Sequence, residues 1–438
     1  MAEEISLYSD RCWIGDSLQP ATITYIAEKI IAVDYIRLPS AIDYSGYIIM
    51  PGIIDAHVHV NEPGRTDWEG FDTATMAAAA GGITSIIDMP LNASPVTTTV
   101  AAFREKLNAS KGKLNVNCGF YGGLIPGHRS ELESLVMEGI LGVKCFLVHS
   151  GIDEFPDVKY EDIAEVLPML SKKKIPLLAH CEIESIPATK TINTYPDYLK
   201  SRPKQWENDA VGMMIELAEK FDAKVHIVHV SSAETLTAIQ QAKSKGIKLT
   251  AETCPQYIYF SAEDIPEQNT LYKCAPPIRE RSNNDLLKQA LKNGTLNFIA
   301  SDHSPAPPEI KLIDTGDLKN AWGGIAGLQF LLPASWTALK DDLSLESFIP
   351  LVTSQPAAFL QLHSKGKIET GRDADLVIWS PDEKMTIKEK DILHRHRQSP
   401  YTGNKLQGVV HSTIVNGKIV YQNNRIINKN SGKWLFRQ

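Results

Sequence analysis

Short hydrophobic runs alternate with polar turns over the first 50 residues and again after about residue 364. Runs such as residues 22–26 and 29–34 are separated by Gly, Asp and Ser, a pattern typical of antiparallel strands. In the later stretch, Asn416-Gly417 has the sequence most typical of a two-residue type I′ hairpin turn. We therefore predict that residues 1–50 and 364–438 together form one small β-sandwich domain.

Residues 51–363 show a different pattern, in which apolar runs alternate with helical stretches. The runs occupy residues 53–60, 84–89, 115–119, 142–148, 176–180, 224–230, 248–252 and 297–301. Two helical stretches have recognisable ends. Residues 72–80 are rich in alanine and precede Gly81-Gly82, and residues 233–245 lie between Ser232, a good helix cap, and Gly246. Eight strands that each precede a helical or irregular segment predict an α/β protein with a (β/α)8 TIM-like barrel.

A doubly wound parallel sheet also alternates strands and helices, so it is the main rival to the barrel. That fold predicts a phosphate-binding Gly-x-Gly-x-x-Gly after its first strand. Here the first strand leads into His57-Val-His-Val-Asn-Glu-Pro-Gly. The sequence therefore favours the barrel.

The composition is that of an ordinary globular protein, with 438 residues, 43% hydrophobic and 22% charged. The 45 basic and 52 acidic residues give a net charge of −7 and form no long block of one sign, which argues against nucleic acid or a membrane as a partner. No apolar run approaches the roughly 20 residues of a membrane span, and the acidic start is unlike a secretory signal. We expect a cytoplasmic protein whose six cysteines are reduced thiols.

Two histidines end the first barrel strand. Because side chains alternate faces along a strand, His57 and His59 point the same way and could bind one metal ion. Such a pair alone is weak evidence, since two histidines at a strand end can equally be structural. The interpretation gains weight because other metal-ligand residue types end later strands, at the face where barrel enzymes have their active sites. These residues are Lys144, His180, His226, His229 and Asp302.

Lys144 is unusual in this company, because a lysine ammonium has no free lone pair for a metal. It is flanked by apolar residues, where burial favours the neutral amine, and a neutral amine can react with carbon dioxide to form a carbamate. A carbamate is a carboxylate on a long arm and could bridge two divalent ions. Without the histidines, a lysine that extends to solvent from a strand end would be the simpler interpretation.

Some further polar residues are expected to support the site or the fold and not to bind metal. His226 and His229 are an odd number of residues apart, so they face opposite sides of the strand, and His229 is nearer the carboxyl end. We therefore select His229 as the ligand and expect His226 to pack behind the site. Asp55 is expected to support the ligands, and His394-Arg-His396 to form a structural loop.

The chain resembles the cyclic amidohydrolases of the amidohydrolase superfamily, and among them the allantoinases most closely. The similarity rests on motifs in a fixed order along the chain: Pro51-Gly-Ile-Ile-Asp-Ala-His-Val-His, Glu62-Pro-Gly-Arg-Thr-Asp-Trp-Glu-Gly, Asp88-Met-Pro-Leu-Asn, Val143-Lys-Cys-Phe-Leu-Val-His-Ser-Gly, His180-Cys-Glu, His229-Val-Ser-Ser, Glu252-Thr-Cys-Pro, Lys273-Cys-Ala-Pro-Pro-Ile-Arg, Ser301-Asp-His-Ser-Pro and Ala321-Trp-Gly-Gly-Ile-Ala-Gly-Leu-Gln.

The resemblance implies a binuclear metal centre. One ion would be bound by His57, His59 and Asp302, and the other by His180 and His229, with carbamylated Lys144 bridging both. Zinc is the first expectation, although manganese, cobalt or iron suits the same ligands. The resemblance also implies a homotetramer.

The implied activity is hydrolysis of the hydantoin ring of allantoin to allantoate, in purine catabolism. A water activated by the two ions would attack the ring carbonyl, with Asp302 transferring the proton to the departing nitrogen. Hydantoinase-like relatives have a Tyr five residues after the bridging lysine that donates to the substrate carbonyl. This chain has His149 there, so we predict that His149 stabilises the transition state.

The choice of substrate rests on Asn61 and Asn92. Dihydroorotases have an Arg two residues after the histidine pair, where it can bind a substrate carboxylate, whereas this chain has the neutral Asn61. Allantoin has no carboxylate and offers groups that an amide can hydrogen-bond. The motifs imply two more substrate contacts, Cys274 and Gly323. Arg65 would weaken this argument if it turned inward, but we expect it to be exposed.

Two positions depart from the family pattern: relatives commonly have His at Gln256 and Cys at Ala306. Neither is a predicted ligand, so only fine specificity or local packing is affected. The alternatives to an allantoinase are a dihydroorotase, a dihydropyrimidinase or hydantoinase, and, more remotely, a non-catalytic scaffold with the same fold. The scaffold is disfavoured because every expected ligand is present.

Overall fold

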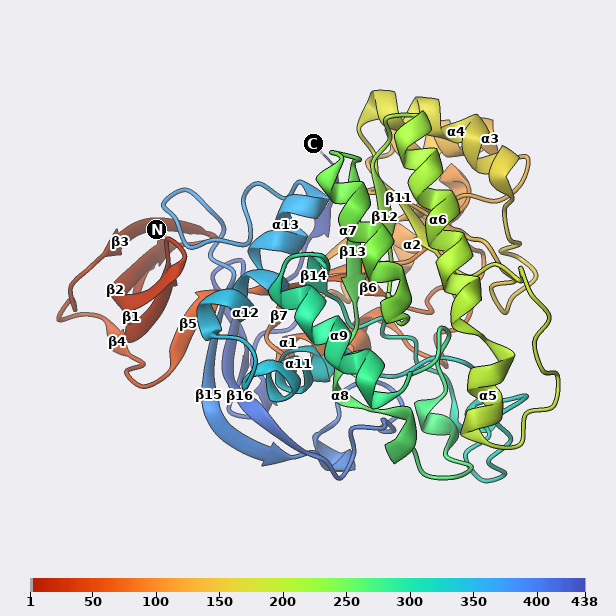
Figure 1. Cartoon of the computed structure of the whole chain (residues 1–438). Coiled ribbons are helices and arrows are strands. Elements are labelled where there is room, and N and C mark those ends of the chain that lie inside the picture. The colour runs from red at the N-terminus through yellow and green to blue at the C-terminus, as the bar shows by residue number, and fades with distance from the viewer. Residues whose placement is uncertain (1–2, 438) are drawn as a thin grey trace.

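The computed structural model describes residues 3–437 and contains a barrel with a β domain at one side (Figure 1). The parallel barrel strands are β6 (Ile53–Val58), β7 (Ile83–Asp88), β8 (Asn117–Phe120), β10 (Val143–Phe146), β11 (Leu177–His180), β12 (Val225–Ile227), β13 (Leu249–Thr253) and β14 (Phe298–Ile299), and β9 (Gly122–Gly123) continues β8 and pairs with β10. Each predicted apolar run overlaps one of these strands, and the predicted (β/α)8 architecture is confirmed.

The ring of strands closes between the first and the last. Val58 forms a parallel bridge with His303, and the His59 N–H donates to the His303 carbonyl at 2.8 Å. Every residue of β6 and β7 is buried. Strands that are covered on both faces have continuous apolar sequences. Polar residues at their carboxyl ends therefore indicate a site at that end of the barrel.

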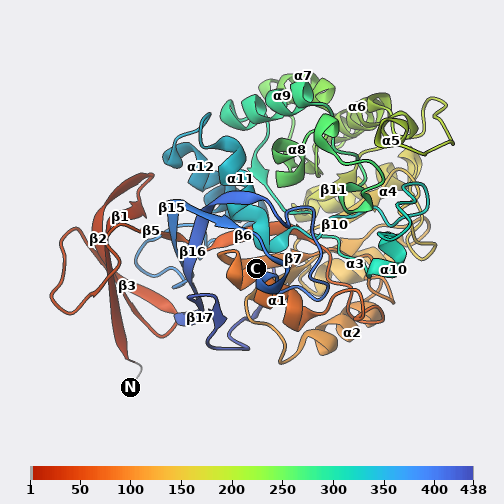
Figure 2. The same cartoon turned by 90° about the horizontal axis from the view of Figure 1, so that it is seen from below.

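Helices surround the barrel strands (Figure 2). They are α1 (Phe71–Ala80), α2 (Val100–Ser110), α3 (Arg129–Met137), α4 (Tyr160–Lys173), α5 (Tyr195–Ser201), α6 (Lys204–Lys220), α7 (Leu236–Ser244), α8 (Pro255–Tyr259), α9 (Arg281–Lys292), α10 (Pro308–Lys311), α11 (Leu331–Leu339), α12 (Leu345–Val352) and α13 (Ser354–Leu360). The alanine-rich α1 ends before Gly81, as predicted.

The predicted cap at Ser232 is wrong. The stretch begins with a 3-10 turn, Ala233–Thr235, and the Ser232 hydroxyl makes no capping hydrogen bond. The Glu207 carboxylate instead accepts the Ser232 N–H at 2.9 Å, and the Asn283 side chain accepts the Ala233 N–H at 2.8 Å. A side chain distant in sequence therefore binds the first N–H of the turn, and the Ser232 backbone carbonyl, in place of its hydroxyl, accepts the Thr235 N–H at 3.4 Å.

The two ends of the chain interleave in one nine-stranded sheet. Its strands are β1 (Glu4–Ile14), β2 (Ser17–Ile26), β3 (Lys29–Asp34), β4 (Ile42–Asp43), β5 (Ile48–Pro51), β15 (Leu376–Thr386), β16 (Lys405–Val415), β17 (Lys418–Gln422) and β18 (Arg425–Ile426). β5 pairs with β1 on one side and with β15 on the other. The β-sandwich domain is thus built from both termini, as predicted, while its exact boundaries at residues 50/51 and 363/364 stay a prediction.

Two local features complete the fold. Asn416 and Gly417 have φ angles of 49° and 75°, as the predicted type I′ turn requires, and they join β16 to β17. Near the carboxyl end, β19 (Trp434–Leu435) pairs in parallel with β8 and adds to the barrel wall.

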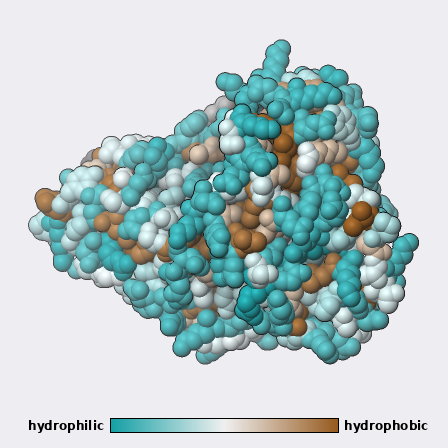
Figure 3. Space-filling view, in the orientation of Figure 1, coloured by the Kyte–Doolittle hydropathy of each residue, from teal (hydrophilic) through white to brown (hydrophobic). Residues whose placement is uncertain are grey.

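The face of the molecule seen in Figure 3 is mainly hydrophilic, with scattered hydrophobic residues. Over residues 3–437, no helix combines the length and the apolar character needed to cross a membrane.

Candidate metal centre and substrate cavity

A cavity of about 760 Å³ opens at the carboxyl ends of the barrel strands. The six predicted metal ligands all line it: His57, His59, Lys144, His180, His229 and Asp302. Each side chain is buried or nearly so. The barrel therefore brings together residues that are far apart in the sequence. His57 and Asp302, for example, are separated by 245 positions.

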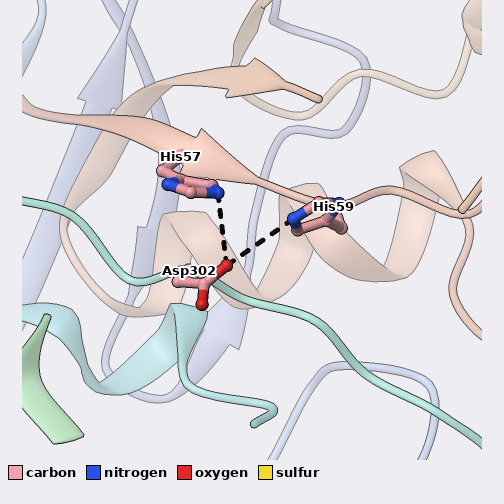
Figure 4. A group of neighbouring side chains, drawn as sticks. All are labelled: His57, His59 and Asp302. Carbon is pink, nitrogen blue, oxygen red and sulfur yellow. Dashed lines mark ion pairs between the residues drawn. The ribbon is translucent and has the colours of Figure 1, made fainter. Parts of the chain in front are cut away.

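The first group of ligands consists of His57, His59 and Asp302, whose side chains converge in Figure 4. Asp302 Oδ1 lies 3.2 Å from His57 Nε2 and 3.6 Å from His59 Nε2. One possible ligand atom from each residue lies within 4.8 Å of the others. Two imidazoles and a carboxylate are common ligands of divalent transition metals, so this group could hold a metal ion.

Contacts between the first and last strands hold this group in place. Asp55 Oδ1 accepts the backbone N–H of His57 at 3.2 Å and that of Ser301 at 3.0 Å. Asp302 has a φ of 46°, in the left-handed region that non-glycine residues seldom occupy. Strained backbone of this kind is found where surrounding structure fixes it, often at functional sites. Asp55 supports the ligands, as expected from its position.

Glu252 is not among the residues predicted for the site, yet it contacts the predicted ligand His57. Its Oε1 lies 2.6 Å from His57 Nδ1, and its Oε2 lies 3.1 Å from His226 Nε2. A carboxylate on the far nitrogen of a histidine fixes the ring orientation and makes the other nitrogen a better ligand. Glu252 ends the predicted strand 248–252, so the criterion that selected the histidines would also have found it. His226 lies behind Glu252.

The second group consists of His180 and His229. His180 Nδ1 lies 2.9 Å from His229 Nε2, and His180 Nε2 lies 2.7 Å from Glu182 Oε2. Arg202 Nε donates to Glu182 Oε1 at 3.0 Å, so the carboxylate is held from its other side. Burial lowers the pKa of both histidines, which keeps the rings neutral, as metal ligands must be.

Lys144 lies close enough to both groups for its charge to act on His57, His180 and His229, and it is completely buried. Among residues 3–437 its Nζ has no hydrogen-bond partner. Burial lowers the pKa of Lys144 to about 8, although Asp302 and Glu252 oppose the shift. An unpaired buried ammonium is costly, so the environment favours the neutral amine.

The cavity floor thus contains several polar atoms that need a partner. His57 Nε2, His229 Nδ1 and Lys144 Nζ are buried, and within the described chain none makes a hydrogen bond. Buried polar atoms are nearly always paired, so unpaired ones call for a bound group. This set of donor atoms fits divalent cations.

The predicted substrate residues have different positions relative to the cavity. Asn92 and Gly323 line it. Asn61 is buried behind the wall, where its side chain donates to the Pro305 carbonyl at 3.3 Å. Cys274 is also buried there, and its carbonyl accepts the Tyr198 hydroxyl at 2.7 Å. All four assignments remain predictions.

His149 lies at the rim of the cavity, where 58% of its side chain is exposed. Its Nδ1 accepts the Gly151 N–H at 3.2 Å, and its Nε2 lies 3.4 Å from Asp153 Oδ1. The imidazole therefore contacts its own loop. Its role in the transition state stays a prediction.

Arg65 and His396 do not line the cavity. The expectation that Arg65 is exposed is wrong, because only 21% of its side chain is accessible. The side chain donates to the Asn92 carbonyl at 2.9 Å and pairs with Glu154 at 3.3 Å, so it does not weaken the argument from Asn61. His396 Nε2 lies 2.7 Å from the Asp67 carbonyl, in keeping with a structural loop.

Loops between the barrel strands supply much of the wall, and several of the residues involved lie in the motifs of the resemblance without a role predicted for them. Trp322 packs edge-on against Trp68, with ring centroids 4.8 Å apart. Tyr198, Arg202 and Lys273 also line the cavity. No strand-end pattern marks these positions, because the loops are placed by tertiary contacts.

Comparison with known proteins gives consistent relatives. The chain is 43% identical to an allantoinase of Arabidopsis thaliana, over 87% of this chain and 79% of that protein. It is 41% identical to an allantoinase of Streptomyces avermitilis over 95% of both chains, and 36% identical to one of Saccharomyces cerevisiae over 97% and 96%.

Solved structures with the same architecture include an L-hydantoinase (dihydropyrimidinase) from Arthrobacter aurescens, with a TM-score of 0.92, 27% identity and full coverage of both chains. A dihydropyrimidinase from Brevibacillus agri has a TM-score of 0.88 and 27% identity over 99% of both chains. The amidohydrolase family profile matches residues 48–420, which include every residue of the cavity floor. With the match spanning most of the chain, this protein belongs to the amidohydrolase family.

Proposed function

We propose that this protein is an allantoinase, a metal-dependent hydrolase that opens the hydantoin ring of allantoin to give allantoate. The reaction class is carried by one observation, the convergence of His57, His59 and Asp302 at the carboxyl ends of the barrel strands. The choice of ring is supported by the relatives named allantoinase, at 36–43% identity over most of the chain.

The amidohydrolase family is metal-dependent, and the proposed site holds two divalent ions. His57, His59 and Asp302 would bind one ion, His180 and His229 the other, and a carbamate on Lys144 would join them. Zinc is the first choice, with manganese, cobalt or iron compatible with the same ligands. When bound, the ions supply Lewis acidity and lower the pKa of a water towards neutrality.

The Lys144 carbamate requires a neutral amine. The Nζ lone pair attacks the carbon of carbon dioxide, an N–C bond forms, and one N–H proton is released, so the product carries a single negative charge. Complete burial and the lack of a partner for Nζ among residues 3–437 favour this step.

Asp302 acts as the proton carrier in the proposed mechanism. Its carboxylate takes a proton from the attacking water while the water oxygen bonds to the ring carbonyl carbon. The C–N bond of the ring then breaks, and Asp302 gives the proton to the departing nitrogen. The new carboxylic acid ionises and releases the remaining proton.

Residues around the floor are proposed to orient the ring. Asn92 and Gly323 line the cavity and would contact the substrate directly. Asn61 and Cys274 would act by shaping the wall from behind, and His149 would stabilise the transition state if its loop folded inward. The protein is further proposed to be a cytoplasmic homotetramer, which light scattering on the purified protein would check.

A second candidate function is that of a dihydropyrimidinase or hydantoinase, favoured by the TM-scores of 0.92 and 0.88 to such enzymes. A dihydroorotase is the third. Turnover of allantoin, hydantoin, dihydrouracil and dihydroorotate by one metal-loaded sample decides among them. We expect allantoin to have the highest kcat/KM, and a preference for another ring would overturn the allantoinase proposal.

A further inference from the structure

One stretch of the cavity wall, residues 319–324, is held in place by two lysine side chains, one of which also lines the cavity. All six of its residues line the cavity. The stretch follows α10 and has no helix or strand of its own. Its backbone polar groups must therefore be satisfied by other parts of the chain.

Lys311, in α10, supplies three of the contacts. Its Nζ donates to the carbonyls of Lys273, Trp322 and Gly324, at 2.9, 3.1 and 2.6 Å. The side chain is 5% exposed. An ammonium has three N–H donors, so this lysine uses all of them on backbone carbonyls.

Lys273 supplies two more contacts from the neighbouring loop. Its Nζ donates to the carbonyls of Lys319 and Ala321, at 3.1 and 2.5 Å. In addition, the Gly324 N–H donates to the Lys273 carbonyl at 2.9 Å. The two lysines together therefore bind the carbonyls of four of the six residues in the stretch.

Among the remaining backbone groups of this stretch, the N–H and C=O of one residue have no partner within the described chain. The N–H groups of Lys319 and Asn320 bind the Asp317 side chain, and those of Ala321 and Trp322 bind the carbonyls of Asp317 and Ile310. Within the described chain, Gly323 is the one residue of the stretch whose N–H and C=O both lack a partner.

The N–H and C=O groups of Gly323 match a cyclic amide. An amide ring presents a C=O acceptor beside an N–H donor, and the backbone of Gly323 offers the complementary donor and acceptor. Gly323 also has open space at the Cβ position, since the nearest atoms are those of Ala275 at 3.9 Å. Lys311 binds the carbonyls on both sides of Gly323 and so restrains the backbone that carries these two groups.

We propose that Lys311 and Lys273 are positioning residues that fix residues 319–324 so that the backbone of Gly323 meets the amide edge of the substrate. This inference rests on the proposed function, because it takes the ligand to be a cyclic amide. Burial lowers the pKa of Lys311 to about 7 and that of Lys273 to about 8, which reflects how far each ammonium is withdrawn from water.

Lys243 provides a matched control elsewhere in the fold. Its Nζ also binds two backbone carbonyls, of Gly294 at 3.2 Å and Thr295 at 2.7 Å, together with Asn297 Oδ1 at 2.6 Å. It lies on α7 and does not line the cavity. Loss of Lys243 therefore costs similar hydrogen bonds without disturbing the wall.

The test compares Lys311→Met, Lys273→Met and Lys243→Met, using whichever of the four rings the wild type hydrolyses fastest. A wrong substrate assignment is then seen in the wild type, before any variant is compared. We expect the KM of Lys311→Met and Lys273→Met to rise about tenfold with kcat changed less than about threefold, the pattern of lost binding without lost chemistry. The KM of Lys243→Met should stay within about twofold.

Hydrogen–deuterium exchange gives a readout independent of activity. Peptides covering residues 319–324 should lose protection in Lys311→Met and keep it in Lys243→Met, although both variants unfold at lower temperature. If Lys311→Met does not fold, Lys273→Met carries the same test. Unchanged KM and unchanged protection in a folded variant would overturn the proposal.

Discussion

The two groups on the cavity floor differ in how complete they are. The ligand atoms of His57, His59 and Asp302 lie within 4.8 Å of one another, and Glu252 holds His57 from behind. In the second group, His180 and His229 instead contact each other at 2.9 Å, and Lys144 Nζ has no partner in the described chain. The first group is organised by protein contacts alone, whereas the second needs a modified lysine to become a comparable site.

The reason lies in the barrel topology. The first group joins β6 and the end of β14, which the Val58–His303 bridge and the Asp55 contacts to His57 and Ser301 hold together. The second group is completed by a side chain whose unmodified form cannot bind metal. We therefore expect the first ion to bind without carbon dioxide and the second to depend on it.

The largest effect is expected for Asp302→Asn, which removes the proton carrier. An amide cannot accept the proton, so kcat should fall by about a hundredfold to ten-thousandfold, the range for loss of a general base. Steady-state kinetics with metal analysis of the same sample measure this. Near-normal kcat would remove Asp302 from the proton transfer.

Lys144→Ala should disable the second group more than the first. We expect loss of the second ion and at least about a hundredfold lower activity, because loss of the bridge leaves the two histidines with no carboxylate ligand. Metal content measured by mass spectrometry should recover when a short carboxylic acid is added to fill the gap. Unchanged metal content without the acid would contradict the carbamate.

Two substitutions, each of a carboxylate behind one group of histidines, test whether the two groups bind metal independently. Glu252→Gln should weaken the first ion and Glu182→Gln the second, each by about 10-fold to 100-fold, as for other carboxylates behind metal-binding histidines. Competition with a chelator measures both affinities, and each variant is the control for the other. Equal effects on both ions would show that the groups are not independent.

The smallest effect is expected at His149. We predict that His149→Ala lowers kcat by about tenfold, while His149→Tyr, which restores the residue of hydantoinase-like relatives, lowers it less. The exposed imidazole makes a stability effect small, so thermal melting should hardly change. Wild-type kcat in the alanine variant would exclude the role.

The sequence predicted the barrel and its floor better than its walls. The ends of apolar strands mark His57, His180, His229 and Asp302, because parallel strands expose only their carboxyl ends to the cavity. The same criterion applied to Glu252 would have found it.

The walls depend on contacts that no local pattern records. Lys311 and Lys273 donate to backbone carbonyls on another loop. The first N–H of the turn after Ser232 binds Asn283, from a separate helix. Asn61 ends behind the wall because its side chain binds the Pro305 carbonyl, 244 residues away in the sequence. Such pairings are decided by the folded barrel.

A crystal structure of the zinc-loaded protein, grown with bicarbonate and measured at the zinc absorption edge, tests the comparison most directly. We predict one anomalous peak among His57, His59 and Asp302, a second beside His180 and His229, and extra density on Lys144 Nζ between them. Without bicarbonate, the first peak should persist and the second should weaken. A single peak at the second group, or none at the first, would contradict the account.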